Sequence, residues 1–60
     1  MLYFEIRNRL GGVVGTKTYE RYDEAVSDAK KMPEAFRVVQ MIEQYGESSY
    51  AGEAWRKKVA

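Results

Sequence analysis

Hydrophobic and polar residues alternate at the start of the chain. In residues 2–8, LYFEIRN, the apolar face holds Leu2, Phe4 and Ile6, while a tyrosine and charged residues hold the other. A period of two over this length is typical of a β-strand with one face in a core. The pattern therefore predicts a first strand close to the N-terminus.

A second strand is predicted directly after the first. The Gly-Gly pair at 11–12 favours a tight turn, and the segment 13–19, VVGTKTY, is rich in β-branched residues. A three-residue loop over 10–12 would join the two strands into a hairpin. The expected cross-strand pairs are Arg9 with Val13, Glu5 with Lys17 and Tyr3 with Tyr19.

Apolar residues recur at helical spacing in the middle of the chain. They fall at i, i+3, i+4, i+7 and i+10, which gives one stripe made of Tyr22, Ala25, Val26, Ala29 and Met32. Acidic residues in the first turn and lysines in the last turn complement the helix dipole. Pro33 ends the helix. The charge gradient along this segment therefore has a structural cause rather than a regulatory one.

A third strand is predicted in the segment 36–46, FRVVQMIEQYG. We expect the inward residues to be Phe36, Val38 and Ile42, with Gln40 at the edge of the core. Residues 46–52, GESSYAG, favour a turn. The final segment 53–60, EAWRKKVA, alternates well enough for a fourth strand, with a short helix or a tail as alternatives.

These elements predict a single α+β domain over residues 1–60. A right-handed crossover through the helix makes the third strand antiparallel to the first and its neighbour. The expected fold is ββαββ, with a single helix packed on one face of a three- to four-stranded antiparallel sheet in the order 2-1-3-4. The other face of the sheet would have no cover.

Size and composition restrict how such a domain is stabilised. The chain has 60 residues, 45% of them hydrophobic, with no cysteine and no histidine. A domain of this size buries only about 60% of the surface of its unfolded chain. Disulfides, thiol nucleophiles and histidine metal ligands are excluded. Core quality or self-association must supply the stability.

Catalytic chemistry finds little support in the sequence. The serines at 27, 48 and 49 have no histidine to activate them, and Glu24 with Asp28 forms a solvated helix face rather than a calcium loop. The glycines near residue 12 lead into a strand, not into the helix that a phosphate loop requires. We therefore expect no enzyme, no cofactor, no metal and no small-molecule substrate. Without a signal peptide or an apolar span, a cytoplasmic setting is expected.

The uncovered face of the sheet is the predicted contact surface, for a protein partner or for a second copy in a homodimer. Aromatic and arginine side chains are the usual anchors of such interfaces. The candidate contact residues are Tyr3, Arg7, Lys17, Tyr19, Arg37, Val39, Met41, Tyr45 and Trp55. The alternative is a single-stranded nucleic-acid binder that uses Tyr3, Tyr19 and the basic residues 56–58. The net charge of +1 predicts no strong non-specific attraction to polyanions.

One motif links the second strand to the helix. It consists of Tyr19, Glu20, Tyr22, Asp23, Glu24 and Ala25. With the Gly-Gly turn before it, this order resembles small accessory proteins encoded by phages, prophages and plasmids. The resemblance implies a protein that binds a host or viral macromolecule, in some cases as an inhibitor of a defence system.

Overall fold

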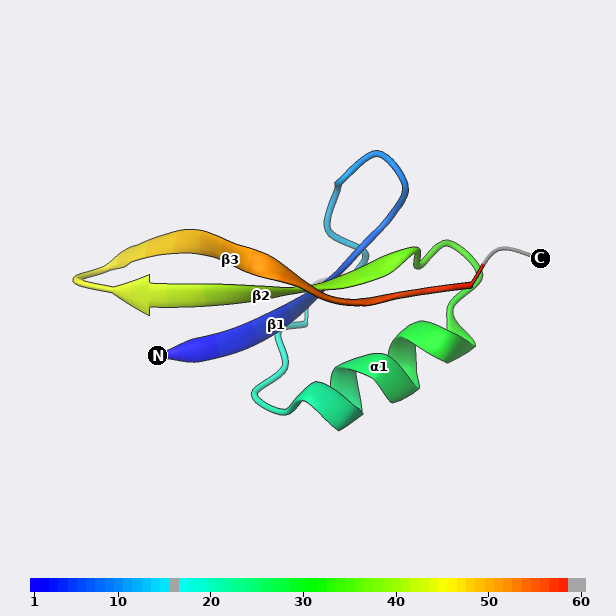
Figure 1. Cartoon of the computed structure of the whole chain (residues 1–60), viewed down its shortest axis with the longest axis horizontal. Helices are drawn as coiled ribbons and strands as arrows, with labels where there is room; N and C mark the ends of the chain where they lie inside the picture. Colours follow the sequence, from blue (N-terminus) through cyan, green and yellow to red (C-terminus); the bar gives the residue numbers. More distant parts are fainter. Residues whose placement is uncertain (16, 59–60) are drawn as a thin grey trace.

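This computed structural model describes residues 1–15 and 17–58. Within them, the chain forms three antiparallel strands and one helix. In chain order they are β1 (Leu2–Arg7), α1 (Tyr22–Lys31), β2 (Arg37–Gln44) and β3 (Glu47–Arg56) (Figure 1). β2 lies in the centre of the sheet, with β1 and β3 on either side. The predicted α+β class with one helix is confirmed.

The first strand, the helix and the next strand lie where the sequence places them. β1 pairs antiparallel with β2, so that Ile6 lies opposite Val38. The helix begins at Tyr22 and ends at Lys31, where the next residue, Met32, turns to an extended backbone just before the proline. Its buried residues, Ala25, Val26 and Ala29, belong to the predicted stripe.

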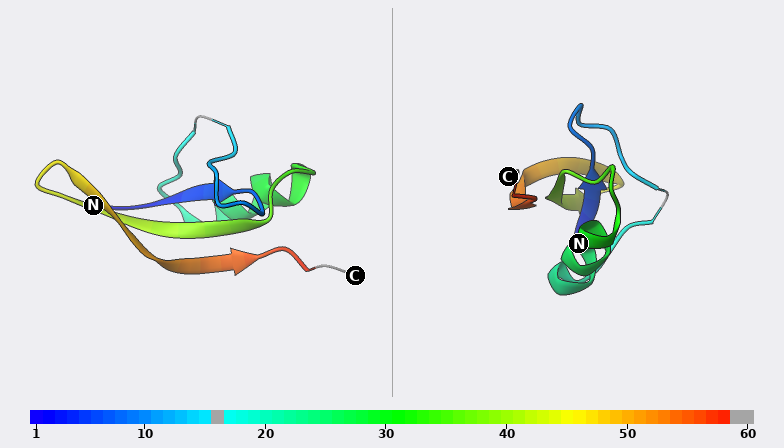
Figure 2. Two further views of the ribbon diagram at one scale, coloured as in Figure 1. Left: turned by 90° about the horizontal axis from the view of Figure 1, so that it is seen from above. Right: turned by 90° about the vertical axis from the view of Figure 1, so that its right-hand side faces the viewer.

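The predicted second strand is wrong. Among the described residues of the segment 13–19, strand pairing with β1 is limited to two isolated bridges, Arg7 with Val13 and Phe4 with Tyr19, and neither is an expected pair. Gly15 has φ +77, a conformation that takes the chain out of the sheet. Figure 2 shows the chain on either side of residue 16 standing away from the strands; residue 16 itself lies outside the described residues. The described sheet therefore has the order β1-β2-β3 rather than 2-1-3-4.

The predicted turn over 46–52 is also wrong, because the chain reverses earlier. Tyr45 and Gly46 form a two-residue hairpin turn with φ 54 and φ 79, the pattern of a type I′ turn. β3 then runs from Glu47 to Arg56, so the predicted fourth strand at 53–60 exists only as the last part of β3. Val59 and Ala60 lie outside the described residues.

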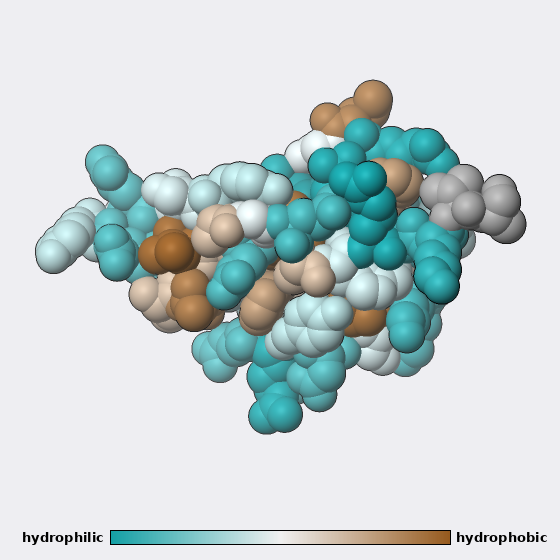
Figure 3. Space-filling view, viewed as in Figure 1, coloured by the Kyte–Doolittle hydropathy of each residue, from teal (hydrophilic) through white to brown (hydrophobic). Residues whose placement is uncertain are grey.

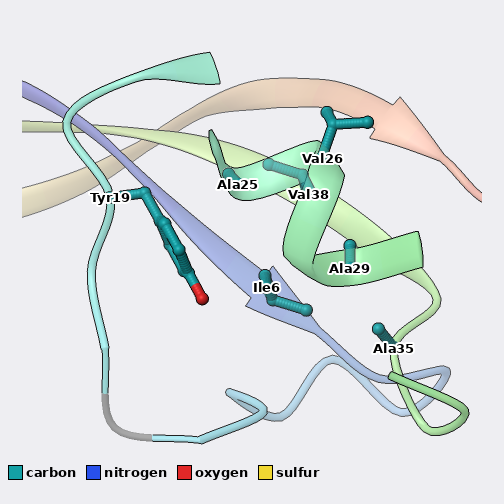
Figure 4. Packing of buried hydrophobic residues seen from close by; sticks show 7 residues of the cluster. All are labelled: Ile6, Tyr19, Ala25, Val26, Ala29, Ala35 and Val38. Atoms are coloured by element: carbon teal, nitrogen blue, oxygen red, sulfur yellow. The ribbon is translucent and has the colours of Figure 1, made fainter. Parts of the chain in front are cut away.

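The hydrophobic core is small. Its members come from β1, α1, β2 and the segments beside them: Ile6, Tyr19, Ala25, Val26, Ala29, Ala35 and Val38 (Figure 4). Three of these seven are alanines, and the only large side chains buried completely are Ile6 and Val38. This core contributes less hydrophobic stabilisation than one built from leucine, isoleucine and phenylalanine.

The helix covers only part of the sheet. It packs on β1 and β2, while the tip of the β2–β3 hairpin extends well beyond it (Figures 1 and 2). The molecule is accordingly long, 40 × 22 × 19 Å. We refer to residues 41–50, the distal part of the hairpin, as the arm. Residues 43–50 of the arm are all exposed.

Candidate interaction surfaces

The sheet face opposite the helix is charged rather than hydrophobic. Glu5 pairs with Arg7, and Glu53 Oε1 lies 3.0 Å from Arg56 Nη2 and 3.8 Å from Arg37 Nε. Val39 lies between Glu5 and Glu53 in the strand register and is only 3% exposed. Long charged side chains cover apolar surface with their stems. Val39 faces outward as predicted, but the prediction that it is open to a partner is wrong.

The outer face of the arm is more aromatic. Met41 lies between Tyr3 on β1 and Tyr50 on β3 and is 8% exposed, so its predicted exposure is also wrong. The Tyr3 hydroxyl donates a hydrogen bond to Ser48 Oγ at 2.9 Å. Tyr50, which the sequence did not single out, is 64% exposed.

Tyr19 lies on the helix side of the sheet, which contradicts the prediction that it faces outward. It is 3% exposed, and its hydroxyl donates a hydrogen bond to Asp28 Oδ2 at 2.8 Å. Burial, aided by the hydrogen bond and the negative charge of Asp28, raises the pKa of Tyr19 to about 12. The excursion at Gly15 places Tyr19 opposite Phe4 instead of Tyr3, and a one-residue slip moves a side chain to the other face.

Lys17 and Tyr45, two further predicted contact residues, lie apart from each other. Lys17 is exposed, with its Nζ 4.9 Å from the centre of the Tyr19 ring. Tyr45 is fully exposed at the tip of the arm, in a left-handed conformation that is costly for tyrosine. The structure therefore does not bring the nine predicted contact residues together into one surface.

An apolar surface lies instead on the helix side of the sheet, beside and beyond the first turn of the helix. We call it the apolar patch: Leu2, Phe4, Tyr22 and Ile42. Leu2 is 52% exposed and Tyr22 46%. The Phe4 and Tyr22 rings meet edge to face with centres 6.0 Å apart, and Phe4 also packs against the core. Figure 3 shows hydrophobic atoms gathered near the N-terminal end of β1.

Positive charge collects at the opposite end of the molecule. The ends of β1, α1 and β3 and the start of β2 lie there together (Figure 1), bringing in eight of the ten lysines and arginines but three of the nine acidic residues. We call this region the basic end. Its basic residues are Arg7, Arg9, Lys30, Lys31, Arg37, Arg56, Lys57 and Lys58, and its acidic residues are Glu5, Glu34 and Glu53. This uneven distribution of charge is not visible in the sequence, because the basic residues come from separate segments of the chain.

Three arginines of the basic end surround the ring of Phe36. The guanidinium carbons of Arg9, Arg37 and Arg56 lie 4.8, 5.2 and 5.6 Å from the ring centre. This is cation–π geometry. The predicted inward position of Phe36 is wrong, because β2 begins only at the next residue and Ala35 fills the core instead.

A cavity of about 720 Å³ opens beside Trp55 at the basic end, and we call it the Trp55 groove. Trp55 lies opposite Val38 and packs against the core from the helix side, not on the outer face as predicted. The cavity is lined by Lys30, Trp55, Arg56, Lys57 and Lys58. Lys57 Nζ donates a hydrogen bond to the carbonyl of Met32 at 2.8 Å, which ties β3 to the end of the helix.

No match to the chain is found among protein-family models, curated proteins or solved structures. Within the described residues, no three acidic side chains lie close enough together to hold a metal ion. No described helix combines the length and apolar character needed to cross a bilayer. The apolar patch and the basic end are the two surfaces of the described residues that are best suited to bind a partner.

Proposed function

We propose that this chain is a non-enzymatic interaction domain that works as a homodimer, with the apolar patch as the contact surface. The observation that carries the proposal is the continuity between core and patch. Ile6, Phe4 and Leu2 lie on one face of β1, and their exposure rises from 0% at Ile6 to 52% at Leu2. The same hydrophobic face is therefore buried under the helix at Ile6 and exposed to solvent at Leu2.

A second copy is the occupant that the size of the core favours. A domain of 60 residues without cysteine lacks disulfide cross-links, and among the described residues only Ile6 and Val38 are large side chains that are fully buried. Small domains of this kind commonly gain stability by oligomerisation. Dimerisation would enlarge the core of each copy with the leucine, isoleucine and aromatic side chains of the patch.

The patch is held in place by the sheet. The Met1 amine donates a hydrogen bond to the Glu43 carbonyl at 2.8 Å, and the Glu43 N–H donates one back to the Met1 carbonyl at 2.8 Å. These bonds continue the β1–β2 ladder up to the first residue. Binding then requires little ordering of the chain, which lowers its entropic cost.

The expected interface extends beyond the patch. A stable interface buries about 800 Å² on each partner, roughly a fifth of the 4366 Å² surface of one copy. Four residues do not supply this area, so the contact would continue onto the arm. Tyr45, which is fully exposed and lines a hollow together with Ile42, is a suitable anchor there.

Sedimentation equilibrium over a range of protein concentrations tests the proposal. We expect the unaltered chain to form dimers, and Leu2→Lys to remain a monomer because it would place a charge in the centre of the interface. Leu10→Lys is the matched control, since Leu10 is 96% exposed in the turn after β1 and lies outside the patch. A monomer at all concentrations, or equal dissociation by both variants, would refute the proposal.

A further inference from the structure

We infer that the Trp55 groove binds single-stranded nucleic acid. This inference is independent of the homodimer, because the groove and the apolar patch lie at opposite ends of the molecule. Of the five described residues that line the groove, four are cations, none is acidic, and the fifth carries an indole ring. Proteins that bind single strands combine these two features, cations for the phosphates and an aromatic ring for a base.

The positions of the cations suit an extended anionic chain rather than a single ion. Lys30 comes from the end of α1, whereas Lys57 and Lys58 follow β3, so the positive charge lines both sides of the groove. The end of α1 also carries the negative pole of the helix dipole, but the lysines in its last turn offset this pole. The groove thus presents a positive surface that follows the molecule from the helix to the sheet.

The arginines around Phe36 extend this surface on the other side of β3. Arg56 belongs to both clusters, since it lines the groove and lies 5.6 Å from the Phe36 ring. The acidic side chain Glu53 neutralises part of the charge of Arg37 and Arg56. With the molecule 22 × 19 Å across its shorter dimensions, the contact would cover on the order of four nucleotides.

A single strand fits better than a duplex. The base-stacking surface offered here is one tryptophan in the lining of the groove, and only an unpaired base can present its face to it. A paired duplex would be limited to phosphate contacts with the lysines of the groove. An acidic peptide would use the charges but not the indole, so it serves as the comparison in the test.

Intrinsic fluorescence can be used to follow binding at the groove, because Trp55 is the only tryptophan in the sequence. We expect a ten-nucleotide oligo(dT) to quench Trp55 fluorescence on titration. About four phosphate contacts predict a slope near −3 in log affinity against log salt, or a roughly 50-fold loss between 50 and 200 mM. Absence of binding at 50 mM salt, or equally tight binding of poly-glutamate, would overturn the inference.

Variants separate stacking from charge. With a fluorescently labelled oligonucleotide, Trp55→Leu should weaken binding roughly ten-fold, because it keeps the apolar packing but removes the stacking ring. Lys30→Gln should reduce the salt slope by about 0.7. Lys17→Gln is the matched control, because Lys17 borders a separate hollow with Asp23, Glu24 and Asp28. The affinity of this variant for the oligonucleotide should equal that of the unaltered chain. Equal effects of the two lysine variants would overturn the assignment to this groove.

The two proposals fail separately. Leu2→Lys changes the apolar patch and leaves the Trp55 groove intact, so it should bind oligo(dT) as tightly per chain as the unaltered protein. A loss of oligonucleotide binding in this variant, with its fold preserved by circular dichroism, would show that the groove of a single copy is not the binding site.

Discussion

Ile6 and Leu2 lie on the same face of the same strand, yet one is completely buried and the other is 52% exposed. The difference arises because the helix covers the sheet at Ile6 but does not extend over Leu2. A helix of ten residues is about 15 Å long, whereas a strand of ten residues such as β3 is about 33 Å long. One short helix therefore cannot cover this sheet, and the arm stays bare while the other half has a core.

The comparison has an electrostatic counterpart. The basic end lies where the helix ends, whereas the arm carries two acidic residues, Glu43 and Glu47, and no lysine or arginine between residues 41 and 50. The half of the molecule under the helix thus contains both the core and the positive surface. The half with the arm contains the apolar patch and a negatively charged hairpin. Two surfaces of different chemistry at opposite ends permit two binding events without competition.

Shortening Ile6 should have the largest effect on stability. Ile6→Ala leaves a cavity in a core where, among the described residues, Val38 is the one other large side chain that is fully buried. It should lower the free energy of unfolding by about 2–5 kcal/mol. Leu2→Ala, on the bare part of the same face, should cost much less in the monomer. Urea unfolding at low protein concentration measures both, and equal losses would contradict the division into covered and bare halves.

The burial of Tyr19, together with its hydrogen bond to Asp28, should make the stability of the chain depend on pH. Because folding raises the pKa of Tyr19 from its usual 10.0 to about 12, this group stabilises the folded state fully below pH 10 and loses that contribution as the pH rises towards 12. At neutral pH, Tyr19→Phe should cost about 1.5 kcal/mol through the lost bond to Asp28.

Thermal unfolding of both proteins between pH 9 and 12 tests this prediction. The unaltered chain should lose more stability over that range than Tyr19→Phe. Identical slopes for the two proteins would mean that Tyr19 is not buried against the helix.

The turn of the arm should give the smallest effect, and one of opposite sign. Tyr45 adopts φ 54, where asparagine is preferred in this kind of turn. Tyr45→Asn should stabilise the monomer by about 0.5–1 kcal/mol. Tyr50→Asn is the control on β3, where the backbone is extended and no gain is expected. A loss of stability in Tyr45→Asn would mean that the tyrosine ring stabilises the hairpin.

The sequence predicts the covered half of the fold well. The alternation in β1 and the helical stripe that ends at Pro33 both specify an element and its buried face, so the strand–helix–strand unit is as predicted. Such patterns are reliable where one face of an element is buried. In residues 43–50 of the arm no side chain is buried, and the segment 46–52 has the polar and glycine-rich composition of a turn although most of it is strand.

The candidate surfaces were harder to predict, because single residues decide them. The positive φ at Gly15 changes the face of Tyr19, and the hairpin turn at Tyr45 lacks the usual Asn-Gly signal. The basic end depends on four segments that meet only in three dimensions. The resemblance to accessory proteins of phages and plasmids and the expected cytoplasmic setting stay predictions.

Nuclear magnetic resonance of a mixed sample, half of it isotopically labelled and half unlabelled, tests the central claim most directly. If the apolar patch is the contact between two copies, isotope-filtered spectra should show magnetisation passing between copies from the methyl groups of Leu2 and Ile42. Such signals should be absent for Leu10, which projects from the turn at the other end of β1. Spectra at millimolar concentration without any transfer from Leu2 or Ile42 would contradict the account.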